Sequence, residues 1–231
     1  MRYLCDKVVV FDLDDTLYKE IDYLESAFKD IANDVGVLCG VSSLTVYQFM
    51  IQAYYAGEDD VFQKLIDKYS LPIEKERLLL MYRQHKPKVA MRREDVAILA
   101  KLKSAGVVMG LMTDGRSLTQ RNKIEALGLD KFVLEDNILI SEESGYCKPS
   151  EKGCLYFIKK FPDAQFWYVG DNVAKDFFAP NKLGWTTIGL KDDGRNIHKQ
   201  IELKGVGYMP NKWIDSLSEL LYIVLGNETV L

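Results

Sequence analysis

Histidine, cysteine and proline are scarce in this chain. Its 231 residues include 2 histidines, 6 prolines and 4 cysteines, namely Cys5, Cys39, Cys147 and Cys154, and no two cysteines form a Cys-x-x-Cys pair. Structural zinc sites need several His or Cys ligands at close spacing, so the sequence argues against one. With no low-complexity or heptad run either, disorder, collagen-like repeats and coiled coil are not expected.

An excess of basic charge is also absent, because 30 Lys and Arg stand against 34 Asp and Glu, a net charge of −4. Proteins that bind nucleic-acid phosphates usually carry a basic excess, so no nucleic-acid partner is expected. The first seven residues are polar and lack the layout of a signal peptide, which predicts a cytoplasmic protein with reduced cysteines. The apolar share of 48% is typical of a globular protein with a core.

One uncharged stretch, residues 35–57, is long enough to cross a bilayer. Two glycines, a Ser-Ser pair and two glutamines interrupt it. These residues favour two packed helices that meet at residues 40–43, so no membrane contact is expected.

Residues 22–85 have a helical pattern throughout. Leu24, Phe28, Ile31 and Val35 recur at the spacing of one face of an amphipathic helix. Three further helices are predicted over residues 44–55, 61–69 and 74–84, and no strand is predicted in this block.

Around this block, short apolar runs alternate with helical patterns. Strands are predicted over residues 8–11, 107–112, 138–140, 166–169 and 185–190, and helices over residues 93–104, 118–127, 150–160, 175–183 and 215–225. Such alternation indicates a parallel sheet covered on both faces. The predicted fold class is α/β, a Rossmann-like parallel-sheet core formed by residues 1–18 and 88–231, with an all-helical domain, residues 19–87, inserted after the first strand.

Polar segments follow four of the predicted strands, and in open parallel sheets ligands bind beyond the carboxyl ends of the strands. The segments are Asp12-Leu13-Asp14-Asp15-Thr16, Thr113-Asp114-Gly115-Arg116, Lys148-Pro149, and Gly170-Asp171-Asn172 with Asp176 five residues after Asp171. The sequence therefore predicts a site of carboxylates, a threonine and a lysine at one edge of the sheet.

The residue types of this site suit phosphoryl transfer. Asp12, Asp14 and Asp171 would repel one another unless a cation neutralised them, and oxygen ligands suit Mg²⁺. Thr113 and Lys148 offer donors to phosphoryl oxygens, and a carboxylate can act as nucleophile to form an aspartyl-phosphate.

The same segments carry a resemblance to a known family. Phe11-Asp12-Leu13-Asp14-Asp15-Thr16-Leu17-Tyr18 resembles the first motif of the haloacid dehalogenase (HAD) superfamily. Leu111-Met112-Thr113-Asp114-Gly115 is similar to the second motif, Lys148-Pro149 to the third, and Gly170-Asp171-Asn172 with Asp176 to the fourth. The resemblance extends from residue 8 to residue 190, and the helical block resembles the C1-type cap of that superfamily.

The resemblance implies a role for each motif residue. Asp12 would be the nucleophile that attacks phosphorus, and Asp14 would protonate the leaving oxygen and later activate water. Thr113, Lys148 and the backbone N–H of Asp114 would hold the phosphoryl group.

The resemblance also implies a metal site. Mg²⁺ would be held by the Asp12 carboxylate, the Asp14 backbone carbonyl and Asp171. Asn172 and Asp176 would support the site, Asp176 by orienting Lys148 or a water molecule of the metal.

Each motif also has a simpler interpretation. An isolated Asp-x-Asp-x-Thr is also typical of a turn with a helix cap, Lys-Pro is common in loops, and Asp176 could simply stabilise the start of a helix. Arg116 either reaches a substrate anion or is solvated, and His198 is expected on a solvated surface. Four motifs in the family's order favour the functional interpretation.

The sequence thus predicts a Mg²⁺-dependent phosphatase with a cap that closes over a small phosphorylated metabolite. A phosphomutase is an alternative, but it would need a basic cluster in the cap, and none is evident. A metal-free dehalogenase and a catalytically idle binding protein are further alternatives, and the presence of both Asp12 and Asp14 argues against them. The substrate, the choice between Mg²⁺ and Mn²⁺, and the choice between monomer and homodimer stay open.

Overall fold

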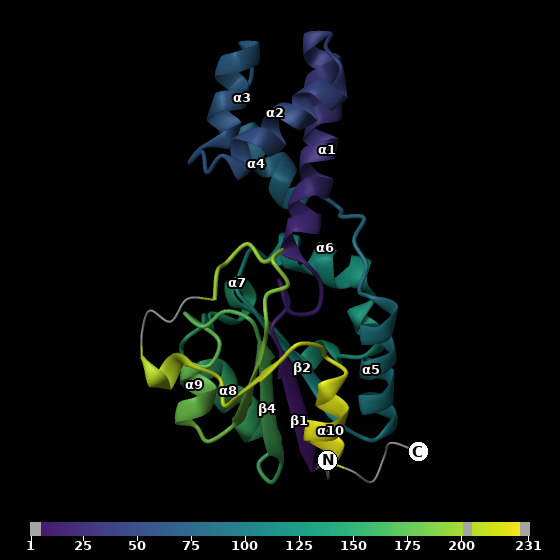
Figure 1. Ribbon diagram of the computed structural model, residues 1–231, viewed down its shortest axis with the longest axis vertical. Helices are drawn as coiled ribbons and strands as arrows, with labels where there is room; N and C mark the ends of the chain where they lie inside the picture. The colour runs from purple at the N-terminus through teal and green to yellow at the C-terminus, as the bar shows by residue number, and fades with distance from the viewer. Residues whose placement is uncertain (1–5, 201–204, 227–231) are drawn as a thin grey trace.

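The computed structural model describes residues 6–200 and 205–226 (Figure 1); Cys5 and most of the polar N-terminal segment lie outside them. A six-stranded parallel sheet in the order β3-β2-β1-β4-β5-β6 forms its centre. The strands are β1 Lys7–Phe11, β2 Val108–Thr113, β3 Ile138–Ile140, β4 Gln165–Gly170, β5 Thr186–Leu190 and β6 Lys212–Ile214. The predicted α/β fold class is therefore confirmed, and β6 is a strand that the sequence analysis did not predict.

The apolar run of β1 is continuous because helices cover both faces of the sheet. Val9 and Phe11 pack into a cluster with α5 (Arg93–Ser104), α6 (Ser117–Leu127) and α10 (Glu219–Leu225). Val8 and Val10 face the opposite cluster, with α8 (Lys152–Lys160) and the residues around α9 (Phe178–Lys182). Alternate residues of one strand thus serve two cores, the pattern expected of a central parallel strand.

Several helix boundaries differ from the prediction. The helix expected over residues 175–183 is shortened to α9, because the N–H groups of Lys175 and Asp176 donate to the Asn172 carbonyl in a turn. The helix expected over residues 215–225 begins only at Glu219, after β6. A short helix not predicted, α7 (Ser141–Ser144), follows β3, and the 3₁₀ turns are η1 Leu129–Lys131, η2 Glu135–Asn137 and η3 Val206–Tyr208.

The inserted block forms four helices that stand above the carboxyl edge of the sheet (Figure 1). They are α1 Glu20–Cys39, α2 Ser43–Tyr55, α3 Val61–Tyr69 and α4 Lys75–Gln84. Leu24, Phe28, Ile31 and Val35 lie buried on one face of α1, as predicted, within a hydrophobic cluster of this block.

The uncharged stretch forms two packed helices rather than one. Helix α1 ends at Cys39, and the residue that follows, Gly40, has a φ of 65° in the left-handed region that glycine tolerates best. Helix α2 begins at Ser43. Across the described ranges, 6–200 and 205–226, no helix has the length and apolar character needed to traverse a bilayer.

Candidate active site

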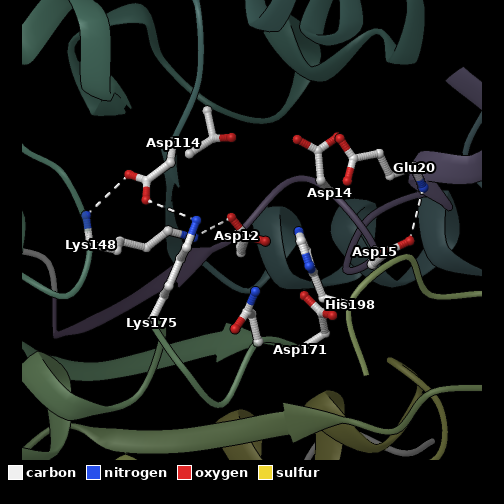
Figure 2. A pocket seen from close by; sticks show the side chains of 11 residues that line it. Asp12, Asp14, Asp15, Glu20, Asp114, Lys148, Asp171, Lys175 and His198 are labelled. Atoms are coloured by element: carbon white, nitrogen blue, oxygen red, sulfur yellow. Dashed lines mark hydrogen bonds and ion pairs between the residues drawn. The ribbon is translucent and has the colours of Figure 1, made fainter. Parts of the chain in front are cut away.

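Three adjacent strands end at the same level and deliver the polar segments to one pocket (Figure 2). In the sheet register, Phe11 lies opposite Leu111 of β2 and Val169 of β4. Asp12 follows directly and donates its N–H to the Val169 carbonyl at 2.8 Å. The pocket is lined by Asp12, Asp14, Asp15, Glu20, Thr113, Asp114, Lys148, Asp171, Asn172, Lys175 and His198. Seven of the eight site residues named from the sequence line it, and the eighth, Asp176, lies buried behind Lys148.

Lys148 is held between two buried carboxylates. Its Nζ lies 2.5 Å from Asp12 Oδ1 and 2.7 Å from Asp176 Oδ1. Burial by itself disfavours the ammonium, but Asp12 and Asp176 outweigh burial and raise the pKa of Lys148 well above its usual value. Tyr168 donates its hydroxyl to the same Asp176 oxygen at 3.2 Å, so Asp176 is fixed from two sides. Lys148 is therefore a permanent cation directed at Asp12.

Three buried carboxylates form a cluster whose donor set suits a hard divalent cation. One oxygen from each of Asp12, Asp171 and Asp176 lies within 4.8 Å of the others. Burial, followed by repulsion from Asp176, raises the pKa of Asp12 to about 8 against the opposing effect of Lys148. Burial, Asp176 and Asp12 raise the pKa of Asp171 to about 9. The single positive charge of Lys148 does not compensate the negative charge of three ionised carboxylates. Carboxylate oxygens are the ligands that Mg²⁺ prefers. The residues present fit that ion.

The side chain of Asp14 belongs to a different set of contacts from this cluster. Its Oδ1 accepts hydrogen bonds from Lys123 Nζ at 2.7 Å and from the Tyr18 hydroxyl at 2.5 Å, and its Oδ2 accepts one from Gln120 Nε2 at 2.9 Å. Burial opposes ionisation of Asp14, but Lys123 and these hydrogen bonds outweigh it and lower the pKa of Asp14. Of Asp14, the resemblance implied only the backbone carbonyl as a metal ligand, and this role of the carbonyl stays a prediction.

Asp114 and Thr113 occupy the end of β2. The Asp114 carboxylate accepts the backbone N–H of Lys148 at 3.1 Å, so it fixes the segment that carries this lysine. The Thr113 hydroxyl accepts a hydrogen bond from Gln120 and is almost fully buried. Arg116, left open by the sequence, pairs with the exposed Glu142 and is not among the pocket residues.

A loop after β5 completes the pocket, and the sequence analysis did not predict its role. Asn196 donates to Asp171 Oδ2 at 2.9 Å, and the N–H of Ile197 donates to Asp15 Oδ2 at 2.8 Å. His198 is exposed, as expected, but it lines the pocket rather than a featureless surface. Loop residues without helical or strand periodicity carry no local signal of such contacts.

Comparisons with known proteins agree with this geometry. A family model described as haloacid dehalogenase-like hydrolase matches residues 9–190. A glyceraldehyde 3-phosphate phosphatase of Methanocaldococcus jannaschii is 29% identical over 197 residues, which cover 80% of this chain and 84% of the relative. A protein of the same name from Pyrococcus abyssi is 30% identical, over 80% of this chain and 81% of the relative.

A solved structure shares the fold over almost the whole chain. It is the HAD hydrolase YfnB of Bacillus subtilis bound to magnesium, which is 21% identical with a TM-score of 0.62 and covers 95% of this chain and 99% of that one. The likeness extends to the arrangement of sheet and helical insertion.

Proposed function

The chain belongs to the haloacid dehalogenase-like hydrolase family, and on that premise we propose that it hydrolyses a small phosphorylated metabolite with Asp12 as the nucleophile. The observation that carries this proposal is the placement of Asp12 at the end of β1, in contact with the Lys148 ammonium and two residues before a second acid. We also propose that residues 19–87 act as a cap on a core formed by residues 1–18 and 88–231.

The proposed reaction has two steps. A carboxylate oxygen of Asp12 bonds to phosphorus while the bond to the leaving oxygen breaks. Asp14, which the negative charge of the bound substrate holds in its protonated form, gives its proton to that oxygen. Water then attacks phosphorus, Asp14 takes up a proton from the water, and phosphate departs as the Asp12 carboxylate is restored. Lys148, the Thr113 hydroxyl and the Asp114 N–H are the donors that would hold the phosphoryl oxygens throughout.

Asp12, Asp171 and Asp176, with the Asp14 backbone carbonyl, are the proposed ligands of Mg²⁺. When bound, this ion supplies positive charge that offsets the charge of the phosphoryl oxygens. A relative of this fold bound to magnesium and the buried carboxylate cluster support this assignment. Phosphate release from a panel of phosphorylated metabolites, with Mg²⁺, with Mn²⁺ and with a chelator, tests activity and metal together.

The two sides of the pocket differ in charge (Figure 2). Lys148 and Lys175 lie on the side of Asp114, and the opposite side carries Glu20 and Asp15. No cation of the inserted helices is among the lining residues that the structure describes. This distribution suits a leaving group without negative charge and disfavours the bisphosphates that a phosphomutase binds. Glyceraldehyde 3-phosphate, named for the relatives, meets this condition.

A matched pair of substrates tests the charge selectivity. Glyceraldehyde 3-phosphate and 3-phosphoglycerate differ in an aldehyde against a carboxylate, and like charges brought together in a site cost binding energy. Burial and the neighbouring Asp14 raise the pKa of Glu20 to about 7, so steady-state kinetics are compared above that pH, where Glu20 is largely ionised. We expect kcat/KM to be at least about 10-fold higher for the aldehyde. Equal or better turnover of the carboxylate would contradict the proposed pocket polarity.

Gly170 offers a test of the Asp176–Lys148 contact. A Cβ at residue 170 would lie 2.5 Å from Asp176 Oδ2, so Gly170→Ala is expected to displace that carboxylate and the lysine it holds. Because a misplacement of about 1 Å can cost about 10²-fold in rate, we expect metal-dependent phosphate release to fall roughly 10- to 100-fold.

The matched control for this substitution is Gly207→Ala. A Cβ at residue 207 has its nearest neighbour, the Phe178 side chain, at 3.9 Å, so activity and melting temperature should stay near wild type. A Gly170→Ala enzyme with wild-type turnover would show that the position of Asp176 does not matter.

A further inference from the structure

Lys123 is a buried lysine that the proposed reaction does not use. It lies on α6 with a side chain only 3% exposed. Its Nζ is 2.7 Å from Asp14 Oδ1, 3.5 Å from Glu20 Oε1 and 4.6 Å from the centroid of the Tyr23 ring. It is not among the residues that line the pocket. Lys123 therefore contacts the proposed acid without reaching the space where the substrate would bind.

Two further donors complete the contacts of the Asp14 carboxylate. The Tyr18 hydroxyl shares Oδ1 with Lys123, and Gln120 Nε2 donates to Oδ2 and also to the Thr113 hydroxyl. Gly115 leaves room for Gln120, since a Cβ at residue 115 would lie 3.1 Å from its side chain. Donors on both oxygens define one position for this carboxyl group.

The burial of Lys123 has an energetic cost that a purely structural role does not explain well. An ammonium removed from water is stabilised only by close, well-placed partners, and an apolar side chain at such a position is often as stable or more so. Here the partners are the acid of the proposed reaction and Glu20, the first residue of α1. The positive charge of Lys123 thus lies beside the carboxylate that Asp14 becomes once it has delivered its proton.

We propose that Lys123 is a positioning residue that holds the Asp14 carboxyl in place for protonation of the leaving group. The inference rests on the proposed phosphatase function. The proton passes from Asp14 to the leaving oxygen as the bond between phosphorus and that oxygen breaks and the bond to Asp12 forms, and Lys123 keeps its own protons throughout. Because Glu20 begins the inserted helices, the same lysine also fixes their first turn beside the acid.

Leaving groups of different acidity separate this role from a structural one. An alkoxide needs a proton as it departs, whereas p-nitrophenolate departs without one, so only the alkyl phosphate depends on a well-placed acid. The value of kcat/KM reports the step in which the leaving group departs. We therefore follow the ratio of kcat/KM for p-nitrophenyl phosphate to kcat/KM for the best alkyl phosphate of the substrate panel.

In Lys123→Met we expect this ratio to rise about 30-fold or more, which is part of the roughly 10²- to 10⁴-fold that a general acid contributes. Lys123→Arg keeps a cation and should restore part of the wild-type ratio. The control is Arg121→Met on the same helix, which breaks ion pairs with Glu135 and Glu143 at the surface and should leave the ratio unchanged. Equal losses on both substrates in Lys123→Met would assign Lys123 a structural role only and overturn the proposal.

A smaller substitution keeps the test valid if Lys123→Met does not fold. Tyr18→Phe removes one hydrogen bond to Asp14 and little else, and the ratio should rise about 3- to 10-fold, the value of one such bond. An unchanged ratio in folded Tyr18→Phe would then count against the proposal. A wild-type enzyme inactive on every substrate would instead refute the phosphatase function, so the two failures are distinguishable.

Discussion

Asp12→Asn is expected to reduce metal-dependent phosphate release by about 10⁴-fold or more, because loss of a covalent nucleophile removes the pathway itself. The amide has the shape of the carboxylate, and Lys148 keeps its contact with Asp176 at 2.7 Å, so the fold should persist. Phosphate release under saturating Mg²⁺, with circular dichroism as the check on folding, measures this loss.

The control for Asp12→Asn is a change of carboxylate outside the pocket. Asp136→Asn removes an exposed carboxylate that pairs with Lys160 at 4.0 Å, keeps the backbone carbonyl that accepts hydrogen bonds from Tyr156 and Lys160, and should leave turnover at the wild-type level. If folded Asp12→Asn retained a tenth of the wild-type rate, Asp12 would not be the nucleophile.

Asp171→Asn is expected to have opposite effects on activity and on the stability of the metal-free protein. Asp171 is a proposed metal ligand, so activity should fall about 10²-fold or more and added Mg²⁺ should no longer raise the melting temperature. Without metal, the substitution removes a carboxyl group whose ionisation is disfavoured by burial, Asp176 and Asp12, so folding no longer has to protonate it, and we expect the melting temperature to rise by roughly 3–8 °C. Thermal unfolding with chelator and with Mg²⁺ measures both effects.

The same carboxylates give the metal-free protein a defined pH dependence. Folding raises the pKa of Asp171 from 3.8 to about 9 and that of Asp12 from 3.8 to about 8, so the folded chain binds more protons than the unfolded chain between these values. The free energy of unfolding in chelator should therefore fall as the pH rises from about 4 to about 9. The fall should be less steep in Asp171→Asn. A stability that increases across this window in both proteins would contradict the assigned burial of charge.

The motif residues could be predicted from the sequence because each follows a buried strand. The Val8–Phe11 run is apolar without a break, and parallel strands bring their carboxyl ends to one edge. Asp12 and Asp171 therefore lie together although 158 residues separate them in the chain. Local pattern and sheet topology were sufficient for this part of the site.

The contribution of α6 was not predictable by the same reasoning. Gln120 and Lys123 are polar residues on a helix, and polar helical residues usually face solvent. The structure buries them because α6 packs against the end of the inserted block, where Thr119 donates to the Arg83 carbonyl and Asn122 to the His85 carbonyl. Such contacts arise from tertiary packing, and the only sequence signal is a polar helix directly after the second motif.

Strand β6 escaped prediction for a different reason. It comprises three residues, Lys212–Ile214, too few to show the alternation of a strand. Its pairing depends on Gly189 of β5, where a Cβ would lie 2.6 Å from the Trp213 ring. Because β6 forms through its pairing with β5, the sequence of β6 alone does not predict a strand.

Direct detection of the aspartyl-phosphate tests the central claim. Enzyme quenched during turnover is reduced with borohydride, which converts a phosphorylated aspartate to homoserine, and the peptide around residues 8–19 is sequenced by mass spectrometry. We expect homoserine at residue 12 only, in amounts that depend on substrate and Mg²⁺. Active enzyme that yields homoserine at residue 14, or at neither position under conditions where the intermediate accumulates, would contradict the account.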